Sequence, residues 1–239
     1  MELRGDRECT QCGTRWSYFE TGAVECPDCG SLRSVGVTER KQHTNSPVTL
    51  DLSGVRNQLD DAPFDDVADN AADQCRSYVR QRGFLDAGEL LPLDDRFHAA
   101  AELVHAAAAV RQTMRPSDDE ESYVLALLAG ADRGERPSPD DVPESMRAVR
   151  GLAAVAAEDK YHDDVRTYLD KNPDEPARST LSSLDEHRKR MAALDGDVPL
   201  ATSEGLVSAA RALGHYLRSD EERSLVRTRR HLDALSRLP

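Results

Sequence analysis

Four cysteines, arranged as two matched pairs, constrain the start of this chain more than any other feature. The pairs read Cys9-Thr-Gln-Cys12-Gly and Cys26-Pro-Asp-Cys29-Gly, with residues 13–25 between them. Each Cys-x-x-Cys turn presents two sulfurs to one metal ion, and the glycine after it permits a tight return of the backbone. Two such turns supply four soft ligands in a closed tetrahedral site. The sequence therefore predicts that Cys9, Cys12, Cys26 and Cys29 bind one structural zinc ion.

Other interpretations of the four cysteines are weaker. Two disulfide bonds are disfavoured, because nothing here is typical of a secreted protein and cysteines inside cells usually stay reduced. A redox pair is disfavoured, because that chemistry uses one Cys-x-x-Cys beside a βαβ pattern. Iron is the main rival to zinc, since tetrahedral sulfur geometry suits both metals. We keep iron as the less favoured ion.

The stretch between the cysteine pairs has the pattern of a hairpin. Residues 15–19 predict a strand, residues 20–22 a turn and residues 23–25 a second strand. Trp16 and Tyr18 would then point to the same face. A segment this small cannot bury a core by itself, so metal binding should supply most of its folding free energy, on the order of 10 kcal/mol.

Residues 1–40, with these four cysteines, resemble the zinc-ribbon (rubredoxin-like) superfamily. More narrowly, they look like the transcription factor B-type (TFIIB-type) ribbons of uncharacterised haloarchaeal proteins, and the whole chain with its acidic remainder is similar to those proteins. The resemblance implies metal binding by the four cysteines and a partner in the transcription or translation machinery. The general transcription factor continues into two basic cyclin-like repeats, and this chain shows neither the basic character nor the repeat.

Acidic residues dominate the charge of the chain. Asp and Glu number 44 and Lys and Arg number 31, so the formal net charge is −13. Salt screens such self-repulsion, because the Debye length falls to roughly 3 Å at molar salt. A strongly acidic surface is a poor general nucleic-acid binder. The ribbon would contact nucleic acid only through a modest basic run, Arg33, Arg40, Lys41 and His43, for which a solvated strand and linker is the simpler interpretation.

The sequence also predicts the compartment. No run of 18 or more apolar residues is present, so we expect no transmembrane helix. The first residues, Met-Glu-Leu-Arg-Gly-Asp, lack the apolar centre of a signal peptide. We therefore expect a soluble, cytoplasmic protein with no membrane partner.

After about residue 45 the apolar residues recur at helical spacing. Residues 41–60 are predicted to be a linker and residues 61–239 an acidic all-α domain. Periodicity and capping signals predict about seven helices, at 64–82, 94–115, 117–130, 144–171, 175–194, 203–218 and 221–236. The fold class is thus a small β zinc ribbon followed by an all-α domain.

Single residues refine this helical prediction. Ser117 and Glu120 form a capping box at the start of the third helix. Gly151 makes a break in the fourth helix an alternative to one continuous helix. Cys75 falls on the apolar stripe of the first helix, and we interpret it as a buried thiol rather than as a fifth ligand.

His98, Glu102 and His105 fall on one face of the second helix, at spacings of four and three. Glu-x-x-His is half of the ligand set of di-iron carboxylate proteins. Together with a rubredoxin-like ribbon, it makes a rubrerythrin-like iron redox protein an alternative. The full set needs a second Glu-x-x-His, but Glu158 and His162 are four residues apart. A polar strip that faces water is the simpler interpretation.

Two basic clusters occur late in predicted helices, where cations meet the helix dipole favourably. The first is Arg188-Lys189-Arg190, in which Lys189 is at ion-pair spacing from Asp185. The second is at residues 227–231. Ion pairing within the helices is the simpler interpretation, and a docking surface on the last helix for an acidic partner is the alternative.

No sequence motif indicates catalysis. The chain has no phosphate-binding glycine loop, no Gly-x-Ser-x-Gly elbow and no His-Glu-x-x-His motif. We therefore favour a non-enzymatic intracellular adaptor whose ribbon binds a protein partner, with Trp16, Tyr18 and Phe19 as candidate contacts. The ribbon's own small core is the competing role for Trp16 and Tyr18. A nucleic-acid-binding module that acts through the ribbon is a further alternative.

Overall fold

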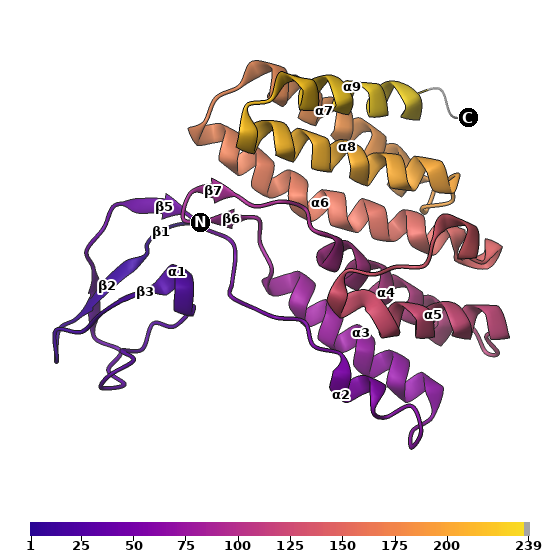
Figure 1. Cartoon of the computed structure of the whole chain (residues 1–239), viewed down its shortest axis with the longest axis horizontal. Coiled ribbons are helices and arrows are strands. Elements are labelled where there is room, and N and C mark those ends of the chain that lie inside the picture. The colour runs from indigo at the N-terminus through magenta and orange to yellow at the C-terminus, as the bar shows by residue number, and fades with distance from the viewer. Residues whose placement is uncertain (237–239) are drawn as a thin grey trace.

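The computed structural model describes residues 1–236 and places a small β region beside a body of helices (Figure 1). The β region contains one helical turn and five strands: β1 (Glu2–Arg4), β2 (Asp6–Cys9), β3 (Arg15–Ser17), α1 (Tyr18–Thr21), β4 (Ser34–Gly36) and β5 (Arg40–Gln42). The body contains a short helix, a hairpin and seven longer helices: α2 (Ser53–Arg56), α3 (Phe64–Gln81), β6 (Leu85–Asp86), β7 (Glu89–Leu90), α4 (Asp95–Gln112), α5 (Asp118–Gly130), α6 (Arg147–Lys171), α7 (Glu175–Ala193), α8 (Leu200–Ser219) and α9 (Glu222–Leu235). The predicted fold class is confirmed.

The strands of the ribbon differ from the predicted hairpin. β2 is the central strand of an antiparallel sheet with the order β3-β2-β4, and β1 pairs with β5. The strand predicted at 23–25 does not form; the third strand instead follows the second cysteine pair, with Cys9 opposite Ser34. The reason is local. Residues after β3 form the helical turn α1, which ends at Gly22 with a left-handed φ of 64° and turns the chain away from the sheet.

The seven long helices of the body lie where the sequence predicts them, within a few residues at each end. The capping box forms, because Glu120 N donates to Ser117 Oγ at 3.3 Å and Ser117 N donates to Glu120 Oε2 at 2.9 Å. The possible break at Gly151 does not occur, since α6 runs through it. A short hairpin, β6–β7, was not predicted; its turn places Ala87 and Gly88 at φ values of 51° and 90°.

Two helices form the centre of the body. α4 contacts α3, α5 and α6, and α6 in turn contacts α7 and α8, which packs against α9. Figure 1 shows the two resulting groups, α3–α5 below and α6–α9 above in that view. Phe84, the residue before β6, enters the core, where its ring centroid lies 4.9 Å from those of Phe97 and Tyr161. The core is therefore continuous between the two groups.

The segment at 41–60, predicted as a linker, is packed onto the body. Leu52 and Val55 are fully buried and belong to the main core cluster. Asp132 Oδ2 accepts hydrogen bonds from Leu52 N at 3.1 Å and from Arg56 Nη2 at 2.8 Å. Apolar side chains on a short segment can be covered by a neighbouring helix, so residues 50–56 of the predicted linker are part of the helical body.

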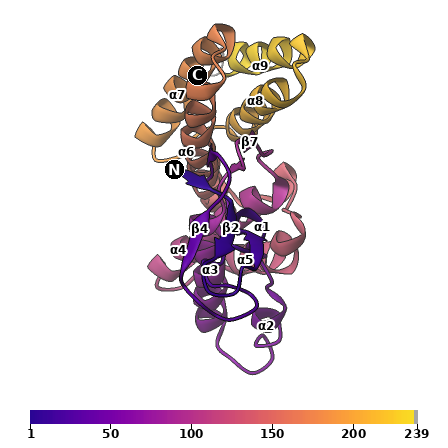
Figure 2. The ribbon, with the colours of Figure 1, turned by 90° about the vertical axis from the view of Figure 1, so that its left-hand side faces the viewer.

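The ribbon rests on the β6–β7 hairpin and on α6, and Figure 2 views the molecule from the ribbon side. Gly88 N donates to Gln42 O at 2.8 Å, and Thr44 N donates to Leu85 O at 2.9 Å. Gln42 Nε2 also donates to Thr167 O on α6 at 2.8 Å. These hydrogen bonds hold residues 42–44, at the end of the ribbon, against the hairpin and α6.

None of the helices in residues 1–236 combines the length and the apolar character that a membrane span requires.

Candidate metal centre

The two cysteine pairs adopt the same backbone turn. The amide of the first cysteine, Cys9 or Cys26, donates to the carbonyl five residues later at 2.9 and 3.0 Å. The amide of the following glycine, Gly13 or Gly30, donates back to that cysteine's carbonyl at 3.0 and 2.9 Å. Both glycines lie in the left-handed region, with φ values of 76° and 69°, which glycine adopts at no steric cost. The repeated turn explains the glycine after each pair.

These turns bring the four sulfurs together. All four Sγ atoms lie within 4.8 Å of one another, with 3.5 Å between Cys12 and Cys26 and 3.6 Å between Cys9 and Cys29. A disulfide needs about 2.05 Å, whereas a tetrahedral ion with Zn–S bonds of about 2.3 Å needs sulfurs about 3.8 Å apart. The cluster is compatible with one zinc ion. Within residues 1–236 it is the one group of His, Cys, Asp or Glu whose ligand atoms gather in this way.

The four thiols do not ionise equally without a bound cation. A hydrogen bond with the Thr14 hydroxyl is the main cause that lowers the pKa of Cys12 to about 6. At Cys29 the backbone amide of Ser31 lowers the pKa, but the neighbouring Cys12 sulfur, burial and the other two thiols outweigh it and raise the pKa to about 12. A metal that binds all four sulfurs as thiolates would therefore displace the protons that remain at neutral pH. Such a metal would supply folding energy and leave no open position for catalysis.

Of the three candidate aromatic contacts of the ribbon, Trp16 is buried and Tyr18 and Phe19 are half-buried. Trp16 is 8% exposed and packs with Cys9 and Cys26, and its Nε1 donates to Ala23 O at 3.0 Å. It is thus part of the ribbon's own core. The rings of Tyr18 and Phe19 lie 6.2 and 4.6 Å from the ring of His43, which is itself buried. These two side chains therefore pack against the segment that follows the ribbon. Because His43 is buried, it does not belong to the exposed basic run.

Four apolar side chains of the ribbon face solvent instead. Their exposed fractions are 47% for Val24, 66% for Leu32, 51% for Val35 and 44% for Val37. β4, which contains Val35, pairs with β2 alone in the described sheet and is an edge strand. Sequence reasoning missed this surface, because the face of a short strand that becomes buried depends on its register.

Glu102 and His98 are buried in the body, so the prediction of a water-facing strip is wrong. Glu102 accepts a hydrogen bond from Tyr123 and lies 2.8 Å from Arg136 and 3.3 Å from Arg150. His98 Nε2 lies 2.7 Å from Arg136 Nη1, so a neutral imidazole accepts from the guanidinium. Burial, followed by the charge of Arg136, holds the pKa of His98 well below its ordinary value.

This network is occupied by arginines rather than arranged for iron. Glu204 completes it, since it accepts two hydrogen bonds from Arg136 at 2.9 Å and one from Arg150 at 2.7 Å. The carboxylate oxygens of Glu102 and Glu204 are therefore bound by guanidinium groups, and the pair of Glu102 and His105 does not fit as half of a di-iron site. The network instead ties the loop that contains Arg136 to α4, α6 and α8.

Two residues of the first basic cluster form ion pairs within the body. Arg188 Nε lies 3.0 Å from the buried Glu158, and the same guanidinium pairs with Asp159 and Asp185 at 2.5 Å. The predicted pair between Lys189 and Asp185 forms at 2.7 Å. Arg190, the third residue, is exposed.

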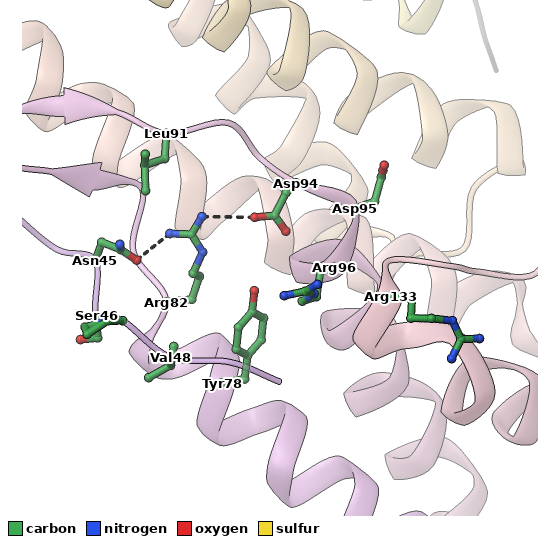
Figure 3. Close-up of a pocket in the computed structure, with 11 residues that line it drawn as sticks. Asn45, Ser46, Val48, Tyr78, Arg82, Leu91, Asp94, Asp95, Arg96 and Arg133 are labelled. Carbon is green, nitrogen blue, oxygen red and sulfur yellow. Dashed lines mark hydrogen bonds and ion pairs between the residues drawn. The ribbon is translucent and has the colours of Figure 1, made fainter. Parts of the chain in front are cut away.

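A cavity of about 510 Å³ lies between residues 45–48 and the start of α4 (Figure 3). Arg82 crosses its wall: Nη1 donates to Asn45 Oδ1 at 2.6 Å, and Nη2 lies 3.2 Å from Asp94 Oδ2. Tyr78 also lines it, and burial raises the pKa of that phenol. Asp94 already compensates the charge of Arg82. We therefore interpret this cavity as part of the junction that attaches residues 45–48 to the body.

The fold and the cysteine cluster define a class of protein in which a four-thiolate ribbon is joined to an acidic helical body. Residues 1–232 match a family of unknown function (DUF7117), and the chain belongs to that family. The match runs from β1 into α9, so ribbon and body form one family unit. No curated protein and no solved structure matches the chain.

Proposed function

We propose that this protein is a zinc-stabilised, non-enzymatic adaptor whose ribbon recognises a protein partner. The observation that carries the proposal is the apolar surface of Leu32, Val35 and Val37, exposed on a ribbon whose own core is already closed by Trp16. Val35 and Val37 are two residues apart on extended chain, so their side chains share a face. An exposed apolar face next to a free strand edge is typical of a site for another protein.

The proposed ion is zinc, with iron as the alternative. A four-thiolate site accommodates either metal, and its closed coordination supports a structural role. The metal would hold the two turns in place and so present the exposed valines on a rigid base. Elemental analysis of the purified protein decides between the two ions.

The class of partner is inferred from charge and from the resemblance to TFIIB-type ribbons of haloarchaeal proteins. A net charge of −13 disfavours direct contact of the body with nucleic acid. The ribbon keeps only Arg33, Arg40 and Lys41 as exposed members of its basic run. We therefore propose a cytoplasmic protein partner from the transcription or translation machinery, with nucleic acid bound by that partner rather than by this chain.

The test compares partner capture by two surface variants. Val35→Lys places a cation opposite Glu8, its cross-strand neighbour, so it disturbs the surface but not the strand pairing. Leu194→Lys, at a side chain of the body that is 51% exposed, is the matched control. Tagged proteins are purified from their own cell lysate with and without nuclease treatment, and zinc is measured in each eluate.

We expect one specific protein to elute with the wild type and with Leu194→Lys but not with Val35→Lys, at equal zinc content. Retention of every partner by Val35→Lys would contradict the proposal. Capture that disappears after nuclease treatment, and weakens when Arg33 and Arg40 are neutralised, would favour the nucleic-acid-binding alternative.

A further inference from the structure

A second hollow of about 510 Å³ lies between the segment before α4 and the helices α8 and α9. Its size falls within the range of small-molecule sites. Three arginines and two histidines line it, against two aspartates: Arg211, Arg218, Arg227, His215, His231, Asp94 and Asp95. None of the residues that line this hollow belongs to the ribbon, so the hollow is independent of the adaptor role.

Two arginines of this hollow differ from the arginines of the buried ion-pair networks. Arg136, Arg150 and Arg188 each pair with two or more carboxylates. Within residues 1–236, Arg218 and Arg227 have no carboxylate oxygen within 4.0 Å, although the chain carries 13 more acidic than basic residues. Uncompensated cations in so acidic a chain indicate a place that attracts an anion.

Arg211 also lines the hollow and is held in place. Its Nε donates to Leu93 O at 2.9 Å, which fixes the guanidinium in position. Its Nη2 lies 2.7 Å from Oδ1 of the mostly exposed Asp95. A guanidinium carries five N–H donors, and these two partners do not use all of them. An incoming anion would accept from the remaining donors.

Hydroxyl contacts also fix the two helices that form the hollow. His215 Nδ1 on α8 lies 3.0 Å from Ser224 Oγ on α9, so the imidazole has a defined position. The basic side chains thus come from helices that are already joined, and little ordering is needed on binding.

We propose that this hollow binds a phosphorylated small molecule of nucleotide size. Guanidinium groups form paired, charge-assisted hydrogen bonds to phosphate oxygens. Pro92, Leu93 and Ala212 supply apolar surface for the rest of the ligand. A smaller hollow on α9 shares Arg227 and adds Arg223 and Arg230. The larger one draws its cations from two helices, which favours a compact ligand over a long polyanion.

Calorimetric titration of the full-length, zinc-loaded protein tests the proposal, with ADP and inorganic pyrophosphate as probes. Arg218→Gln and Arg227→Gln remove the uncompensated cations from the hollow. Arg229→Gln, on the same helix but lining neither hollow, is the matched control. Ellipticity at 222 nm confirms that each variant is folded.

We expect wild type and Arg229→Gln to bind ADP with Kd values within about twofold of each other, and each hollow variant to bind at least about tenfold more weakly, or 1.4 kcal/mol. Binding of pyrophosphate as tight as that of ADP would identify the phosphates as the recognised part. Failure of both probes to bind the wild type at millimolar concentration would overturn the proposal. So would a single-stranded RNA that binds more tightly than ADP and depends equally on Arg223 and Arg230.

Discussion

Asp164 and Thr44, which are 120 residues apart, join the end of the ribbon to the longest helix: Asp164 Oδ2 accepts a hydrogen bond from Thr44 Oγ1 at 2.8 Å. The same oxygen accepts from the buried Phe84 amide at 2.6 Å. Thr44 Oγ1 in turn accepts from Leu85 N at 3.1 Å. One carboxylate on α6 therefore organises three segments, and the position of the ribbon on the body depends on it.

Replacing Asp164 with alanine should loosen this junction. The change leaves the buried Phe84 amide and the Thr44 hydroxyl without their acceptor, at a cost of about 2–4 kcal/mol in the free energy of unfolding. Urea unfolding followed at 222 nm measures the cost, and hydrogen exchange at residues 42–45 measures the loosening. Asp163→Ala is the control, because that side chain is 65% exposed and pairs only with Arg166 among the described residues. Equal effects of the two variants would argue against the junction.

Metal removal should unfold the ribbon and leave the helices intact. Trp16 is the single tryptophan of the chain and packs on two of the four clustered cysteines, so its fluorescence reports the ribbon alone. Because metal binding supplies on the order of 10 kcal/mol to such a site, a chelator should shift the Trp16 emission to the red while ellipticity at 222 nm stays nearly constant. Cys26→Ser should reproduce that spectrum and lower the zinc content below one ion per chain.

Cys75→Ser is the control for the cysteine variant. Burial raises the pKa of this thiol to about 12, and the residue lies in the main core, apart from the ribbon. We expect this variant to keep its zinc and its Trp16 spectrum while it loses about 1–3 kcal/mol of stability for a buried hydroxyl. Loss of zinc from Cys75→Ser, or a Trp16 spectrum indifferent to the chelator, would show that the four-cysteine cluster does not hold the ribbon together.

The features that could be predicted from the sequence are those with local signals. The cysteine pairs and their glycines encode one turn twice, and the Ser117–Glu120 box marks a helix start within four residues. The long helices follow from apolar spacing of three and four. Each of these depends on residues that are near neighbours along the chain.

The features that were missed depend on distant partners. Glu102 resembles a surface glutamate in its own helix, and it is buried because Arg136 and Arg150, 34 and 48 residues further on, compensate its charge. The third strand of the ribbon pairs Cys9 with Ser34 across the whole metal loop. No local pattern indicates either pairing. The same holds for the apolar surface of the ribbon, whose exposure follows from the register of that strand.

Acid should destabilise the protein in part through His98. In the folded state its pKa lies well below the ordinary 6.5, because the ring is buried and faces Arg136. Below pH 6.5, therefore, the unfolded state binds a proton at His98 that the folded state does not bind. The stabilising effect is complete above pH 6.5 and is lost as pH falls toward the folded pKa, by at most about 1.4 kcal/mol per pH unit.

His98→Gln tests this assignment, since glutamine keeps an acceptor for Arg136 but does not titrate. We expect the difference in unfolding free energy between wild type and variant to be constant above pH 7 and to shrink below pH 6.5. Urea unfolding at several pH values measures it. Parallel curves for the two proteins over this range would show that His98 does not contribute to the acid sensitivity.

Gly151 is tolerated inside α6 because the backbone of Gly196 approaches the helix closely at this point. A Cβ at this position would lie 2.0 Å from Gly196 O, in the turn after α7, and a backbone carbonyl cannot move aside as a flexible side chain does. Alanine improves helix propensity by about 1 kcal/mol, but overpacking costs about 1–3 kcal/mol. We therefore expect Gly151→Ala to destabilise the protein by about 1–2 kcal/mol in urea unfolding.

Gly54→Ala is the control, because a Cβ there meets nothing within 4 Å, and it should be neutral or stabilising by up to about 1 kcal/mol. If both substitutions stabilise the protein, the close approach of α6 to Gly196 is not what keeps glycine in the middle of that helix.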